Sequence, residues 1–271
     1  MLEITEDKKA DTRTLWINLP SPTVYLDHCI IGDLAGTPDG ERIRQRICKQ
    51  GTLYLSWAHF VELFSLGDGL TFQRLHSYLT SFGPNFIIVD SDADAIIKRE
   101  QKWSPGKQNP AIDEEFLKVM IAKWKGESPV TISLLLEFMA KEKKFFENIK
   151  SVHTRHKDNI KAIFDKQRQL YRTDKNVKKL LDAAVYKAVK PNITSKVNLE
   201  LSRECVRTNE QFNPSDSLDF HHAVVSVSYC QFAVFDKKWA RRCNSLNLPP
   251  KAVATVFNGK QIANLVAAIG T

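Results

Sequence analysis

Residues 24–27 read Val24-Tyr25-Leu26-Asp27, a short apolar run that ends in a carboxylate. Such a run predicts a buried strand, and its last residue would lie at the edge of a sheet. The next predicted elements are a helix over 41–50, a strand over 52–55, a helix capped by Ser56, a helix over 71–82, a strand over 86–89 and a helix from Ser91 to about Lys102. This alternation predicts an α/β fold, with a central parallel sheet covered by helices on both faces.

The alternation stops at the turn-rich residues 104–110 and resumes after Pro214. Between 112 and about 205 only helical periodicity is visible. The last predicted elements are a helix over 216–229, strands over 232–235 and 253–256, and a helix over 261–268. The sequence therefore predicts a core built from residues 20–110 and 206–271, with an all-helical insertion over 111–205.

Composition limits the class of protein. The chain has 271 residues, of which 43% are hydrophobic, so it can bury a full core. Its five cysteines are scattered without a C-x-x-C pair, which indicates neither a zinc site nor a disulfide framework. The charged N-terminus resembles no signal peptide, and no apolar run reaches a membrane-spanning length. We expect a cytoplasmic protein with no membrane partner.

The positive charge is concentrated in one segment. Residues 141–190 contain fifteen Lys and Arg against six Asp and Glu, so their net charge of +9 exceeds the +8 of the whole chain. A basic helical surface of this kind favours a polyanionic partner, and we expect RNA backbone contacts along it. A solvated helix face and a protein-docking face remain alternatives. The candidate RNA-binding residues are Arg155, Lys157, Lys161, Lys166, Arg168 and Arg172.

Four carboxylates are the candidate catalytic residues: Asp27, Glu62, Asp219 and Asp236. Parallel strands collect their carboxyl ends at one edge, which would bring Asp27 and Asp236 together. Glu62 interrupts an apolar helix in its second turn, where helix capping does not explain a carboxylate. Buried acids that lie close together repel one another unless a cation compensates them, and hard oxygen ligands suit Mg²⁺ or Mn²⁺. We therefore expect a divalent metal site.

Three further candidate polar sites have more than one interpretation. Asp216 lies one helical turn before Asp219, where it would share the metal or cap the helix. His222, the auxiliary candidate, would orient a carboxylate, contact substrate or simply pack in the core. The run from Asp90 to Asp94 lacks the glycine and glutamate of a calcium loop, so a capped helix start is the better prediction.

These residues resemble the PIN-domain nucleases. The matching elements are Val24-Tyr25-Leu26-Asp27, the helix from Ser56 through Glu62, Asp219-Phe220-His221-His222-Ala223, and Ala233-Val234-Phe235-Asp236 followed by Trp239. The resemblance covers roughly residues 20–103 and 210–271. It implies a PIN-like three-layer α/β/α fold and a four-carboxylate metal site, in which Asp27 and Asp236 bind the metal directly. His28 and Cys29 after the first acid, and Phe235 before the last, differ from the usual PIN pattern.

The function implied by the resemblance is a metal-dependent endoribonuclease, of toxin or RNA-processing type. One alternative is a PIN-fold protein that binds nucleic acid or acts as a scaffold without cleaving, because the residues beside its acids have changed. A second is a structure-specific DNA nuclease. Besides RNA, an antitoxin-like protein inhibitor and a second copy of the chain are the partners left open.

Overall fold

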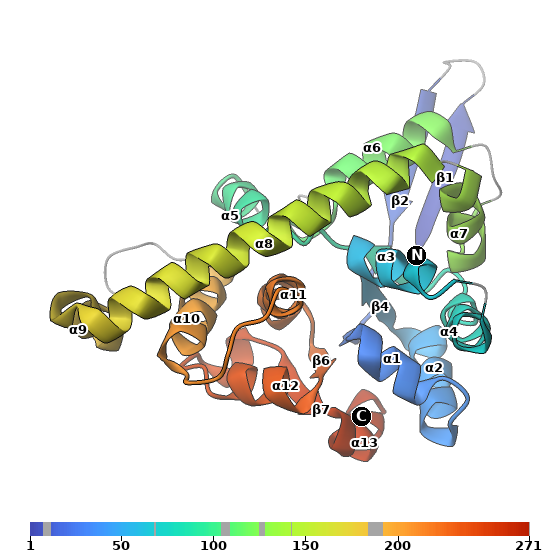
Figure 1. Cartoon of the computed structure of the whole chain (residues 1–271). Helices are drawn as coiled ribbons and strands as arrows, with labels where there is room; N and C mark the ends of the chain where they lie inside the picture. The colour runs from blue at the N-terminus through green and yellow to red at the C-terminus, as the bar shows by residue number, and fades with distance from the viewer. Residues whose placement is uncertain are drawn as a thin grey trace.

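A five-stranded parallel sheet forms the centre of the molecule (Figure 1). The computed structural model describes residues 1–7, 12–67, 69–103, 109–124, 128–141, 143–183 and 192–270. Every residue of the two neighbouring strands β3 and β4 is buried, as expected for strands covered on both faces. The strands are β3 (Thr23–Leu26), β4 (Thr52–Leu55), β5 (Phe86–Ile88), β6 (Phe232–Phe235) and β7 (Thr255–Asn258).

The order of the strands fixes where a site can form. In space it is β5-β4-β3-β6-β7, so the chain moves outward from β3 to β5 and later returns to the other side of β3. The reversal lies between β3 and β6. In open α/β sheets ligands bind beside such a reversal, at the carboxyl ends of the strands. Asp27 and Asp236 each follow one of these two strands directly.

Two groups of helices lie on opposite sides of the sheet (Figure 1). Helices α1, α2, α4 and α13 pack in one group, with α3 against α4, and helices α5, α10, α11 and α12 pack in the other. This arrangement is compatible with a three-layer α/β/α fold. The bounds are α1 (His28–Leu34), α2 (Pro38–Gln50), α3 (Trp57–Ser65), α4 (Leu70–Thr80), α5 (Ala93–Gln101), α10 (Ile193–Arg207), α11 (Asp216–Tyr229), α12 (Lys237–Asn244) and α13 (Ile262–Ile269).

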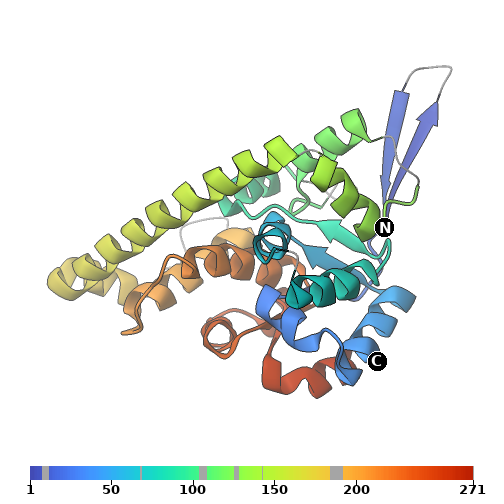
Figure 2. The same cartoon turned by 45° about the vertical axis from the view of Figure 1, so that its right-hand side comes forward.

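Every regular element defined between residues 113 and 207 is a helix: α6 (Glu114–Lys123), α7 (Ile132–Lys141), α8 (Lys143–Thr173), α9 (Lys175–Asp182) and α10. The 31-residue α8 runs across the molecule from α7 to α9 (Figures 1 and 2). It packs against α10 and α11, so the basic segment lies against the helices that cover the sheet. Within the described residues, no helix is long and apolar enough to span a membrane.

Several elements do not follow from the sequence patterns. Strands β1 (Leu2–Asp7) and β2 (Thr12–Ile17) form an antiparallel pair that the charged N-terminal sequence did not suggest. Helices α1 and α12 span only seven and eight residues, too few to show a clear apolar period. Strand β7 begins two residues later than predicted. Two 3₁₀ turns, η1 (Pro250–Ala252) and η2 (Gly259–Gln261), flank this strand.

Candidate active site

Asp27 and Asp236 lie next to each other at the carboxyl edge of the sheet. Strands β3 and β6 pair in parallel with Leu26 opposite Val234, and the backbone N–H of Asp27 donates to the carbonyl of Val234 at 2.9 Å. Asp236 is the N-cap of α12, where its Oδ1 accepts the backbone N–H of Trp239 at 2.7 Å. The reversal in strand order therefore supplies two of the four predicted acids.

Glu62 and Asp219 reach the same place from helices α3 and α11. The pKa of Asp219 is raised to about 8, first by burial and then by the negative charges of four other acids: Asp27, Glu62, Asp216 and Asp236. Burial also raises the pKa of Asp27 to about 6, with Glu62 and Asp236 adding to the shift. Each of these acids is close enough to disfavour ionisation of another. The fold thus brings together all four predicted catalytic carboxylates, here called the acidic cluster.

Two of the three residues that depart from the PIN pattern, His28 and Cys29, contact the acidic cluster. Cys29 Sγ donates to Asp27 Oδ2 at 3.3 Å. His28 Nδ1 lies 3.3 Å from Glu62 Oε2, and burial lowers the pKa of this histidine. These side chains provide local partners for Asp27 and Glu62 where the usual pattern has Ser, Thr or Asn.

Asp216 has partners of its own. Its side chain is 4% exposed, its Oδ2 accepts the backbone N–H of Asn213 at 2.7 Å, and its Oδ1 pairs with the Lys238 ammonium. Hydrogen bonds and an ion pair of this kind stabilise a buried carboxylate without a metal. Of its two predicted roles, these contacts favour the structural one.

The acidic cluster fits a divalent cation in its chemistry. Carboxylate oxygens are the ligands that Mg²⁺ and Mn²⁺ prefer, and the mutual repulsion that raises the pKa of Asp219 would be relieved by a bound cation. The side chains are not yet arranged for one. Across the described part of the chain, no three His, Cys, Asp or Glu side chains are grouped so that they could hold a metal ion. Binding would therefore require these carboxylates to turn toward a shared ion.

A buried polar network behind the acidic cluster was not predicted. Ser56 Oγ lies 2.8 Å from His222 Nε2 and 3.1 Å from His59 Nδ1. The backbone N–H of Ser56 donates to His59 Nδ1, so His59 carries its proton on Nε2 and donates it to the carbonyl of Leu26 at 2.9 Å. Burial lowers the pKa of His59 to about 4, which keeps it neutral.

This network ties together the elements that carry three of the acids. Leu26 precedes Asp27, Ser56 begins the helix of Glu62, and His222 follows Asp219 by one helical turn. The contacts of His222 fit its predicted role as a packed, hydrogen-bonded histidine. The sequence signal for this network is a capping box, in which a polar side chain at the third helical position bonds back to the cap. Here the cap is Ser56, as predicted, and the third residue is His59.

The predicted RNA-binding residues fall on different faces of α8. Lys157 and Lys161 are half-buried, Arg168 is buried, and Lys166 and Arg172 are exposed. The carbonyl of Lys157 accepts Ser217 Oγ of α11 at 2.9 Å, and the charge of Lys157 opposes the rise in the pKa of Glu62. One basic residue of α8 is therefore next to the acidic cluster. Arg155 lies in the helix, but its side chain is outside the described residues.

Two of these basic residues already have acceptors. Arg168 donates to the backbone carbonyls of Thr208 and Glu210, and these hydrogen bonds link α8 to the loop after α10. Lys161 pairs with Asp165 one turn along the helix. These contacts leave Lys157, Lys166 and Arg172 as the better candidates for contacting phosphates from α8.

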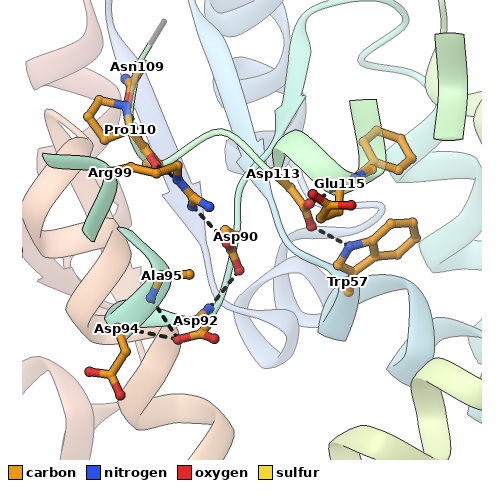
Figure 3. Close-up of polar contacts among 12 residues, drawn as sticks. Trp57, Asp90, Asp92, Asp94, Ala95, Arg99, Asn109, Pro110, Asp113 and Glu115 are labelled. Carbon is orange, nitrogen blue, oxygen red and sulfur yellow. Dashed lines mark hydrogen bonds and ion pairs between the residues drawn. The ribbon is translucent and has the colours of Figure 1, made fainter. Parts of the chain in front are cut away.

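The acids from Asp90 onward form a second group, shown in Figure 3. Asp92 is the N-cap of α5 and accepts the N–H groups of Asp94 and Ala95, as the prediction of a capped helix start requires, although the cap is one residue later than Ser91. Asp90 accepts the backbone N–H of Asp92 and pairs with Arg99 at 2.7 Å. Here the carboxylates of Asp90 and Asp92 each have their own donors.

Comparisons of the chain with protein-family models, with curated proteins and with solved structures give no match. The case for a function therefore rests on the sequence and the geometry of the acidic cluster.

Proposed function

We propose that the chain is a metal-dependent endoribonuclease that hydrolyses phosphodiester bonds at the acidic cluster. One observation carries this proposal: Asp219 is half-buried among other acids that all raise its pKa, beside the reversal in strand order. A fold gains no stability from such mutual repulsion. Acids that converge and oppose the ionisation of a neighbour are characteristic of sites that bind a cation.

In this proposal Asp27, Glu62, Asp219 and Asp236 hold Mg²⁺ or Mn²⁺. When bound, the ion would supply a nucleophilic water at neutral pH and neutralise charge on the phosphoryl oxygens. The protein fixes the elements that carry these ligands, and the carboxylates would turn toward the ion on binding. Asp236 is held by the N-terminus of α12, Glu62 by His28, and the elements of Asp27, Glu62 and Asp219 by the network around Ser56.

Lys157 supports an assignment to phosphodiester substrates. A cluster of ionised carboxylates repels a phosphate, so a neighbouring cation is needed for the substrate to approach. Lys157 is half-buried, held to α11 through Ser217 and electrostatically coupled to Glu62. From this position its ammonium would contact a phosphate beside the cut bond. Arg172, which is exposed on a nearby face of the same helix, would contact the RNA farther along α8.

A second candidate is a nucleic-acid-binding protein of the same fold that does not cleave. The arrangement of the acids favours it, because no three potential ligands in the described residues are grouped for a metal. In that case His28, Cys29 and the cap at Asp236 would hold the acids apart permanently. The basic side of α8 would then carry the whole function. Cleavage of DNA in place of RNA is the third reading.

The test is cleavage of single-stranded RNA and DNA by the full chain in Mg²⁺, Mn²⁺ or EDTA, with Asp236→Asn as the key variant. Asparagine also caps helices, so α12 should keep its N-terminus while the acidic cluster loses a charge. We expect the wild type to cleave RNA only when the metal is present. In the variant the cleavage rate should fall by more than about 100-fold, because mutating even a residue that only supports a metal ligand lowers metal affinity or activity by about 10–100-fold.

The matched control is Asp92→Asn, the same change at the cap of α5, which should cleave as the wild type does. Intact RNA in both metals, with RNA binding retained, would replace the proposal by the non-cleaving alternative. Preferential cleavage of DNA would support the third reading.

A further inference from the structure

A second group of cations lies where α8 and α12 meet the loop after α10. Arg168 of α8 donates to the backbone carbonyls of Thr208 and Glu210. From α12, Arg242 Nη2 lies 3.4 Å from Glu210 Oε2, and Arg241 pairs with the other oxygen of the same carboxylate. Residues that are far apart in sequence thus converge on one loop.

The buried donors in this region outnumber the acceptors. Arg242 is fully buried, with its guanidinium 4.8 Å from the centre of the Trp239 ring, yet its Nε and Nη1 have no hydrogen-bond partner among the described residues. The same holds for Arg168 Nε and Trp239 Nε1. All four of these atoms are N–H donors. A buried donor without an acceptor costs free energy, so the region lacks acceptor atoms specifically.

This region also has fewer acidic side chains than basic ones to pair with. Glu210 is shared by Arg241 and Arg242, and Asp165 is already paired with Lys161. Burial lowers the pKa of Arg168, and the neighbouring charges of Arg172 and Arg242 lower it further. Guanidinium groups that disfavour one another's charge are stabilised by an added anion, as acids are by a cation.

There is room for an anion beside Arg168, the residue of this region that both has an unpartnered donor and lines a hollow. A hollow of about 210 Å³ is lined by Asp165, Arg168, Gln169, Arg172 and Thr173. Arg172 is exposed at its rim, and Arg168 is buried in its wall. Planar guanidinium groups and threonine hydroxyls are common ligands of tetrahedral oxyanions.

We propose that this hollow is an oxyanion site, held by Arg168 and Arg172 with Arg242 behind them, that binds a phosphate group. The site needs neither a metal nor cleavage, so it stands apart from the proposed nuclease activity. Arg168 follows Lys157 by eleven residues, which is three turns and roughly 16 Å along α8. A phosphate in this hollow is therefore distinct from one beside the acidic cluster.

Thermal melting and calorimetry with inorganic phosphate, at ionic strength matched with NaCl and in EDTA, test the site. We expect phosphate to raise the melting temperature of the full chain beyond the chloride control. Arg172→Gln should weaken phosphate binding by about tenfold or more, the usual cost of a charge-assisted hydrogen bond. The exposed Arg172 is the primary variant because Arg168→Gln also removes the tie to the 208–210 loop.

Lys175→Gln, which changes an exposed cation of the neighbouring helix α9 outside the hollow, is the matched control and should bind phosphate as the wild type does. If both variants bound phosphate equally weakly, the effect would be one of general charge and the proposed site would be wrong. The proposal would also be wrong if the wild type melted at the same temperature in phosphate and in chloride. Competition by a short single-stranded RNA in EDTA identifies the source. If RNA displaces phosphate from the wild type, the site binds a phosphate of a nucleic-acid backbone. If RNA does not displace it, the site binds free phosphate.

Discussion

Two groups of acids lie at the carboxyl ends of strands in this sheet, and they are built on opposite principles. The group around Asp90, Asp92 and Asp113 gives each carboxylate a dedicated donor (Figure 3). Asp113 accepts Trp57 Nε1 at 2.6 Å and the backbone N–H of Phe116 at 2.9 Å. In the acidic cluster, Asp27, Glu62 and Asp236 also have polar partners, but the charges around Asp219 all oppose its ionisation.

We interpret this difference as one between structural acids and the proposed metal ligands. Burial raises the pKa of Asp90 too, but hydrogen bonds from Asp92 and Arg99 act in the opposite direction. No such compensation acts on Asp219. Donors offset part of the cost of burying a carboxylate, whereas a carboxylate surrounded by acids is stabilised only when a cation or a proton is bound. Counting acids at a sheet edge does not distinguish the two groups. The charges beside Asp90 and Asp219 do, because Arg99 offsets Asp113 at Asp90, whereas every charge acting on Asp219 is negative.

The largest expected difference is between the variants Asp27→Asn and Asp90→Asn, compared in RNA cleavage and in stability. In the first variant, RNA cleavage should fall by more than about 100-fold, while the metal-free protein melts no lower than the wild type because repulsion is relieved. In the second, cleavage should persist while the free energy of unfolding falls by about 1–3 kcal/mol, because Arg99 loses its charged acceptor. Cleavage assays and chemical denaturation measure both. A lowered melting temperature for metal-free Asp27→Asn would make Asp27 a structural acid.

The pH dependence of stability provides a second test. The pKa of Asp219 is about 8 in the fold against 3.8 for an unperturbed aspartate, so the folded state holds an extra proton between these values. The free energy of unfolding should then fall as pH rises from about 4 to 8, by at most about 1.4 kcal/mol per pH unit. Asp219→Asn should match the wild type near pH 4 and exceed it near pH 8. Curves that stay parallel in EDTA over this range would show that Asp219 is not held among other acids.

The smallest expected effect concerns Lys157. Removing its charge should let the acidic cluster bind Mg²⁺ or Mn²⁺ a few-fold more tightly, since an interaction of about 1 kcal/mol is usual for partly solvated charges. Lys166→Gln is the control because it lies nine residues along, about two and a half turns, on the opposite face of α8. Calorimetry of metal binding compares Lys157→Gln with this control. Equal metal affinities would mean that Lys157 does not act on the acidic cluster.

Much of the architecture was readable from the sequence because it depends on local patterns. The apolar runs at 24–26, 52–55 and 232–235 predicted strands that the structure contains, and the helix over 216–229 has the predicted bounds. The all-helical region between 113 and 207 was visible from its 3.6-residue period. The β1–β2 hairpin was not, since its pairing is a contact between two short polar-rich strands.

For the candidate site, the sequence determined which acids exist and that strand ends would present Asp27 and Asp236. Their chemistry and position in a strand or helix are local properties. Only the tertiary structure decided that Asp216 is neutralised by Lys238, that His59 and His222 meet at Ser56, and that Lys157 lies beside Glu62 while Arg168 turns into the protein. These outcomes depend on how separate helices pack, because a helix period shows which residues share a face but not what that face meets.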